Sequence, residues 1–284
     1  MPDSLELLDL TEVSEGRYLA PLPAGSQEGR DVIFGGQLLA QMIMAASIDA
    51  TDPKHVNSIH TIFARAGTYE QPLHLEVETI HNGRTYGSKI ISALQGDRLL
   101  CKSMILMTAD ESDFIAHDPV LPSDVLAPDA SRESAPGVTF PGAQLRYASG
   151  EHSLVNGVPA MSFWTRMPES VPSVAASQAV LAWSTNGWLI GLALEAHGDV
   201  ATLAQAHQSI STGVIGHTIN FHREFDAGAW TLINQEASFA GKGRVAGQGT
   251  VFNEQRQLLA TFSQNSMVKS VDPAAAGIGT RTRM

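Results

Sequence analysis

The chain has 284 residues, of which 43% are hydrophobic, enough to bury one large core or two modest ones. Its formal net charge of −11, without any run of lysine or arginine, argues against nucleic acid as a partner, because that binding needs a clustered basic surface. No secretory signal is visible and no apolar stretch has the length of a membrane span, so we expect a cytoplasmic protein without a span.

The first half predicts one buried helix followed by an antiparallel sheet. Two short alternating segments come first, at 8–13 and 16–22. The stretch "GGQLLAQMIMAASIDA" (35–50) has almost no polar face and predicts a buried helix, with Gly35 and Gly36 at a close approach to neighbouring strands. Four strand-like runs follow, at 56–65, 72–81, 84–95 and 98–108.

The second half follows the same plan after a proline-rich stretch without periodicity. Its single long helix is predicted at 173–196, where the polar group Ser184-Thr185-Asn186 interrupts an apolar pattern. The predicted strands lie at 143–149 and 159–167 before this helix, and near 212–223, 229–239, 244–253 and 257–268 after it.

Short matches between the two halves indicate an internal duplication. His-Thr-Ile at His60 recurs at His217, and Gly-Arg, Gly and Leu-Leu matches recur in the same order, all at separations of 157 to 160 residues. A buried helix wrapped by a curved antiparallel sheet is the hotdog architecture, so the sequence predicts an α+β double hotdog. The predicted parts are a first hotdog at 1–112, a linker at 113–142, a second hotdog at 143–271 and a disordered tail at 272–284.

Four motifs together resemble the type II (TesB-like) acyl-CoA thioesterases. They are "VIFGGQLLAQ" (32–41), "HNGRTYGSKIISALQ" (81–95), "GHTINFHREFDAGAWTL" (216–232) and "QLLATFSQ" (257–264). The resemblance implies a double-hotdog hydrolase that cleaves fatty acyl-CoA to free acid and CoA, with acyl-CoA as substrate and no separate cofactor. It also implies a homo-oligomer, because hotdog sheets commonly pair further.

The resemblance also implies which positions orient the attacking water. The family's Asp on the second helix falls on Thr185, with Asn186 beside it as a helper, its Thr or Ser on the next strand falls on Val214, and its Gln on the last strand falls on Gln264. The family also has an Asp where this chain has Gly216. Without the carboxylate, a general-base contribution of about 10²–10⁴-fold is missing. We therefore expect weak hydrolysis or, as the alternative, an acyl-CoA binding protein without activity.

Each polar candidate also has a structural interpretation. Ser184 and Thr185 can bond back to helix carbonyls while Asn186 caps a kink before a glycine, and Gln264 can be a satisfied core amide. However, the counterpart of Gln264 in the Leu-Leu register is the apolar Ile105, and this asymmetry favours function. The candidate contacts for CoA phosphates, which on turns can equally be solvated charges, are Arg84, Lys242 and Arg244.

The paired histidines are predicted to be scaffold. No nucleophile elbow accompanies either, and strand alternation places His217 on the face opposite Val214 unless a bulge intervenes. No histidine or cysteine spacing predicts a metal site. A hotdog hydratase or dehydratase is a third hypothesis, but that chemistry wants an acid and a His near the buried helix, and neither helix supplies the pair.

Overall fold

The computed structural model describes residues 4–23, 31–48, 54–121, 125–135, 137–149, 153–155, 157–198 and 210–270. The tail predicted at 272–284 lies outside these residues. Within the described ranges, no helix combines the length and the apolar character that crossing a membrane requires.

The first half forms the predicted helix and strands. The elements are η1 (Ser4–Leu8), β1 (Thr11–Ser14), β2 (Arg17–Ala20), α1 (Gly35–Ser47), β3 (Lys54–Phe63), β4 (Leu73–Asn82), β5 (Tyr86–Gln95) and β6 (Arg98–Ala109). Ten of the 13 residues of α1 are buried, as expected for a helix that is apolar nearly all round.

The second half repeats this order with two additional strands and with its helix in two segments. The elements are η2 (Pro128–Ala130), β7 (Arg132–Ser134), β8 (Gln144–Tyr147), β9 (Ser153–Val155), β10 (Val158–Arg166), α2 (Val174–Ser184), α3 (Trp188–Ala196), β11 (Ile210–Phe221), β12 (Thr231–Gly241), β13 (Arg244–Asn253) and β14 (Leu258–Ser270). The sequence did not predict β7 or β9, because three residues are too few to show a period of two.

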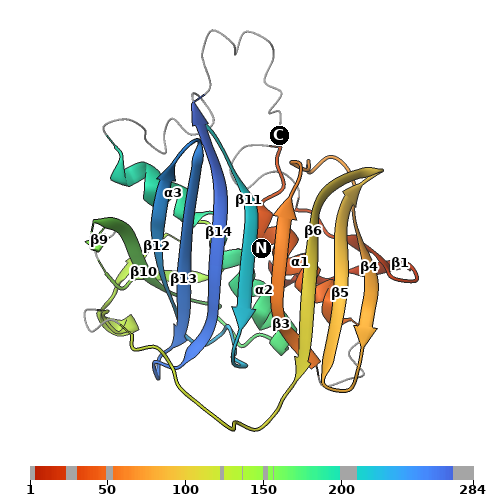
Figure 1. Ribbon diagram of the computed structural model, residues 1–284, viewed down its shortest axis with the longest axis horizontal. Coiled ribbons are helices and arrows are strands. Elements are labelled where there is room, and N and C mark those ends of the chain that lie inside the picture. The colour runs from red at the N-terminus through yellow and green to blue at the C-terminus, as the bar shows by residue number, and fades with distance from the viewer. Residues whose placement is uncertain are drawn as a thin grey trace.

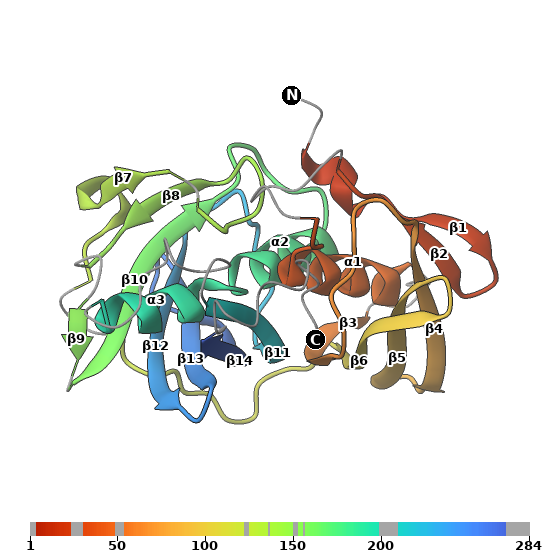
Figure 2. The same ribbon diagram turned by 90° about the horizontal axis from the view of Figure 1, so that it is seen from above.

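The strands of both halves form one continuous 14-stranded sheet. Its order is β1-β2-β4-β5-β6-β3-β11-β14-β13-β12-β10-β8-β7, with β9 paired to β10, and the halves join where β3 pairs antiparallel with β11. Figure 1 shows this sheet face on, with the helices behind it. Seen from above, the ends of the sheet curl around the row of helices (Figure 2). The α+β double hotdog is therefore confirmed.

The two central helices pack closely because of the glycines that open α1. A Cβ added at Gly36 would lie 2.6 Å from the carbonyl oxygen of Trp183 on α2, a distance that real Cβ atoms do not show. A Cβ at Gly35 would lie 3.1 Å from Oδ1 of Asn186. The close approach was predicted, but its main partner is the neighbouring helix and not, as expected, the neighbouring strands.

The second helix is broken where the sequence predicted one continuous helix at 173–196. The first segment, α2, ends at Ser184 and α3 begins at Trp188. Gly187 between them has φ +100°, a backbone conformation that interrupts an α-helix and that other residues rarely adopt. Ser184 Oγ donates to the Val180 carbonyl at 2.9 Å and Thr185 Oγ1 to the Ala182 carbonyl at 2.9 Å. The predicted back-bonding is thus present, and it occurs at a break.

The repeated His-Thr-Ile segments meet at the junction of the two halves, on β3 and β11. In this register His60 pairs with Thr218, and His217 pairs with Thr61. Because paired residues share a face and neighbours along a strand alternate, the two histidines point to opposite faces of the sheet. His60 is exposed on the outer face, whereas His217 is buried on the helix side.

Candidate functional site

A group of buried polar side chains lies where the second helix breaks. Thr185, Asn186, His217 and Gln264 are 0%, 1%, 2% and 1% exposed, respectively. Burying polar groups costs free energy unless they are hydrogen-bonded, so their bonds decide what the group can do. We call these four residues the polar cluster.

Thr185 connects the end of α2 to β11. Its hydroxyl donates to the Ala182 carbonyl and lies 3.2 Å from Nε2 of His217. Its backbone N–H donates to the Leu181 carbonyl at 3.0 Å. The Thr185 side chain, which the sequence analysis matched to the family's carboxylate, is therefore held in one place by two partners, although it carries no charge.

His217 belongs to the polar cluster, contrary to the prediction from strand alternation. The pairing of β11 with β14 shifts between Val214 and Gly216, which is a bulge. This shift turns both Val214 and His217 toward the helices. The ring stacks on Phe262, with centroids 5.9 Å apart and an interplanar angle of 7°. Burial lowers the pKa of His217 to about 4, opposed by a hydrogen bond with the Thr185 backbone, so the imidazole is neutral at pH 7.

Gln264 pairs with His217 across β11 and β14 and ties β14 to the helix break. Its Oε1 accepts from the backbone N–H of Gly187 at 3.2 Å, and its Nε2 donates to Ser266 Oγ at 2.9 Å. Because the Gly187 N–H can only donate, these bonds fix which end of the amide is oxygen. One N–H of Nε2 is left for another acceptor. Gln264 therefore has a structural role, as one interpretation of the sequence predicted, and it also keeps one N–H for a further partner.

Asn186 faces the first turn of α1, next to Gly35. Its Nδ2 is buried and has no hydrogen-bond partner among the described residues. A buried amide donor without a partner costs about 1–3 kcal/mol, so its retention calls for an explanation. A ligand that accepts a hydrogen bond here would remove this cost.

Val214 lies beside the polar cluster but adds only apolar surface. Its side chain packs against Ile190, Leu194 and Ile210 on α3 and β11. Directly across the strand pair is Ser266, which is fully buried and accepts from Gln264. Sequence reasoning missed Ser266; the signal was a small polar residue two positions after Gln264 on an otherwise apolar strand face.

The three basic residues predicted to contact CoA phosphates do not lie together. Arg84 is in the turn after β4, whereas Lys242 and Arg244 flank the turn between β12 and β13. The alternating strand directions place these two turns at opposite ends of the sheet, in opposite halves (Figure 1). Arg244 lies three residues before Gly247, the neighbour of Gln264 on β13, so Lys242 and Arg244 are in the same half as the polar cluster. Strand alternation points the Arg244 side chain to the face opposite Gln264.

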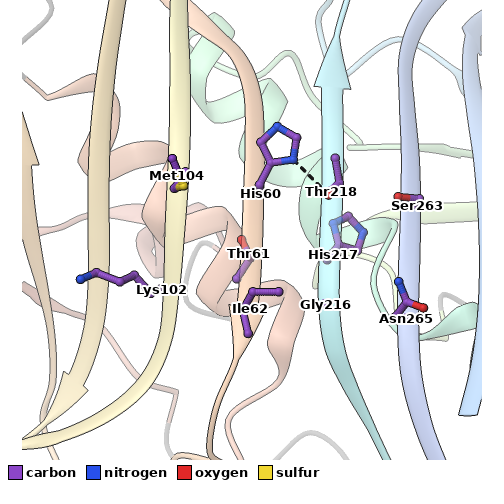
Figure 3. A pocket seen from close by; sticks show the side chains of 10 residues that line it. All are labelled: His60, Thr61, Ile62, Lys102, Met104, Gly216, His217, Thr218, Ser263 and Asn265. Atoms are coloured by element: carbon purple, nitrogen blue, oxygen red, sulfur yellow. Dashed lines mark hydrogen bonds between the residues drawn. The ribbon is translucent and has the colours of Figure 1, made fainter. Parts of the chain in front are cut away.

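A groove of about 440 Å³ crosses β6, β3, β11 and β14 on the outer face of the sheet. Figure 3 shows His60 in this groove, bonded through Nδ1 to Thr218 Oγ1 at 3.2 Å. Ile62 and Met104 give the groove an apolar part and are 67% and 61% exposed. The residues that line this groove include His217, but not Thr185, Asn186 or Gln264, the other three members of the polar cluster.

The polar cluster provides hydrogen-bond donors and one hydroxyl, but no carboxylate. Among the described residues, none of the hydrogen bonds made by its side chains involves an Asp or Glu. Such a group can orient a water molecule and stabilise a developing oxyanion, which are two requirements of acyl transfer to water. Within the same residues, no three His, Cys, Asp or Glu side chains gather as a metal site would need.

Comparison with known protein families matches both halves of the chain. Residues 22–110 match the acyl-CoA thioesterase N-terminal domain, and residues 122–268 match the acyl-CoA thioesterase C-terminal domain. The chain is 26% identical over 255 residues to acyl-CoA thioesterase 2 of Haemophilus influenzae, which covers 84% of this chain and 87% of that protein. It is 22% identical over 265 residues to acyl-coenzyme A thioesterase 8 of Mus musculus, and this alignment covers 84% of this chain and 80% of that protein.

Solved structures share the fold. The tesB protein of Mycobacterium avium subs paratuberculosis superposes with a TM-score of 0.79 at 22% identity, covering 94% of this chain and 98% of that one. TesB2 from Mycobacterium marinum superposes with a TM-score of 0.78 at 21% identity, covering 95% of this chain and 99% of that one. The family matches span both halves in order, and the fold is the same. The chain therefore belongs to the TesB-like (type II) acyl-CoA thioesterase family, a family of thioester hydrolases.

Proposed function

We propose that this family member hydrolyses acyl-CoA to a free fatty acid and CoA at the polar cluster of its second half. The observation that carries the proposal is the burial of Thr185, Asn186 and Gln264 at a helix break, with one amide donor unpartnered and another half-used. A buried amide donor without an acceptor costs free energy, and a bound acceptor would remove that cost. A thioester and its attacking water supply the missing acceptors.

In the proposed reaction, a water molecule attacks the thioester carbonyl carbon directly. Thr185 and the spare N–H of Gln264 hold the water, and the Asn186 Nδ2 donates to the oxyanion that forms. The carbon–sulfur bond then breaks, the water oxygen stays on the acid, and a water proton ends on the CoA sulfur. The chemistry needs no group beyond these side chains and the substrate.

Turnover is expected to be slow. Neither a threonine hydroxyl nor a glutamine amide takes up a proton at neutral pH, so the contribution of a positioned base, about 10²–10⁴-fold, is reduced. The rate then comes from orientation and oxyanion stabilisation. Weak but measurable hydrolysis is what distinguishes this proposal from binding alone.

Release of free CoA thiol from acyl-CoA substrates of increasing chain length tests the proposal. Hydrolysis at one or more lengths, reduced by Thr185→Val, is the expected result. No thiol release at any length from a folded protein would overturn it. Tight acyl-CoA binding in that same experiment would favour the second candidate, a binding protein without activity, which the absence of a carboxylate at Thr185 supports.

Lys242 and Arg244 are the basic residues that we propose for the CoA phosphates, since they are exposed and in the same half as the polar cluster. Replacing both by Gln should raise KM more than it lowers kcat, because the contact is made equally in the ground and transition states. Assembly into a homo-oligomer and a cytoplasmic location stay predictions from the sequence.

A further inference from the structure

The ring of His217 is fixed in position and can bond on one side only. Phe262 stacks on it, and Nε2 points to Thr185. Its other nitrogen, Nδ1, is buried and has no hydrogen-bond partner among the described residues. A buried N–H without a partner costs more than a bare nitrogen, so the proton of the neutral ring belongs on Nε2.

Donation from Nε2 of His217 to Thr185 determines which further hydrogen bonds the Thr185 hydroxyl can make. A hydroxyl has one proton and two lone pairs. Its proton goes to the Ala182 carbonyl at 2.9 Å, and the Nε2–H of His217 occupies one lone pair at 3.2 Å. One lone pair is left. The oxygen can then only accept from a water molecule, as the family's carboxylate would.

We propose that His217 is a positioning residue for hydrolysis: by donating from Nε2, it fixes the Thr185 hydroxyl as a hydrogen-bond acceptor for the attacking water. A water that donates one proton to Thr185 has its own lone pairs directed elsewhere, toward the thioester carbon. The inference rests on the proposed function, and it adds a residue that strand alternation had assigned to the scaffold.

Three variants separate positioning from packing. His217→Leu removes the donor and should lower kcat roughly tenfold with little change in KM, as expected for loss of one transition-state hydrogen bond. His217→Gln keeps a side-chain N–H at a similar reach and should recover most of that loss. The matched control is His60→Leu, which removes a His–Thr bond of the same 3.2 Å length on the outer face and should leave kcat unchanged. Equal losses in the Leu and Gln variants would overturn the proposal.

A double-mutant cycle and NMR complete the test. In a Thr185→Val background, His217→Leu should cause no further loss of kcat, because its effect passes through the hydroxyl; independent, multiplicative losses would contradict this. Nitrogen-15 NMR of the His217 ring at pH 7 should show the Nε2–H tautomer, and the Nδ1–H tautomer would refute the inference. The tautomer is measured without substrate, so an enzyme without any thiol release would count against the proposed function while NMR still decides this point.

Discussion

Acidification should destabilise the fold through His217. The residue is 2% exposed, and burial lowers its pKa from 6.5 to about 4. In the unfolded chain the imidazole binds a proton as the pH falls below about 6.5, whereas in the folded protein it resists protonation until about pH 4. This contribution to stability is therefore complete above pH 6.5, decreases between pH 6.5 and 4, and changes no further below that.

The size of the effect follows from the shift. The difference between 6.5 and about 4 corresponds to roughly 3 kcal/mol in the free energy of unfolding, at about 1.36 kcal/mol for each pH unit. That is a large fraction of the ~5–15 kcal/mol by which domains are typically stable.

Urea denaturation at pH 7.5 and pH 4 measures this contribution, with His217→Gln as the comparison. Carboxylates also titrate in this range, but they do so equally in both proteins, so the difference between the two isolates His217. The stability of the wild type relative to the variant should fall by about 3 kcal/mol between the two pH values. A relative stability that is the same at both would refute the burial argument and the placement of His217 toward the helices.

Three further substitutions test the site and the helix packing. Thr185→Asp restores a carboxylate and should raise kcat about tenfold or more in a thiol-release assay; an unchanged rate would contradict the position assigned to the water. Gly36→Ala should cost about 1–3 kcal/mol in urea denaturation, because its Cβ meets the α2 backbone, while Gly216→Ala, with its nearest atom at 3.6 Å, should cost little. Ser266→Ala removes the partner that holds the Gln264 amide and should lower kcat about fivefold without raising KM, and equal kinetics would show that the bond has no role.

The fold was largely predictable because hydrophobic patterns survive in long elements. The apolar stretch that became α1 and the alternating runs on either side of it predict a buried helix and a sheet without further information. The helix break was harder to locate. Ser184, Thr185 and Asn186 are tolerated inside helices, and only the φ of +100° at Gly187 shows that the helix ends and restarts.

The candidate site was only partly predictable, for a geometric reason. Thr185 and Gln264 were predicted as site residues, and the structure buries both at the helix break. His217 was predicted to be scaffold, because strict alternation turns it away from Val214. One bulged residue between Val214 and Gly216 brings the side chains of Val214 and His217 to the same side of the sheet, and a bulge leaves no reliable mark in the sequence. The His-Thr-Ile repeat predicts the duplicated scaffold correctly, but not the faces to which its two histidines point. It matches His60 to His217 in the sequence, whereas the strand register places the two on opposite faces.

We propose that the polar cluster of the second half hydrolyses acyl-CoA. The most direct test is the rate of thiol release by the wild type, Gln264→Met and Gln178→Met at saturating acyl-CoA. Gln178 is the matched control, since its buried amide donates to the Val56 carbonyl of β3 at 2.7 Å and its Oε1 has no partner among the described residues. Gln264→Met should lose tenfold or more in kcat, whereas folded Gln178→Met should keep the wild-type value. Wild-type turnover by a folded Gln264→Met protein would contradict it.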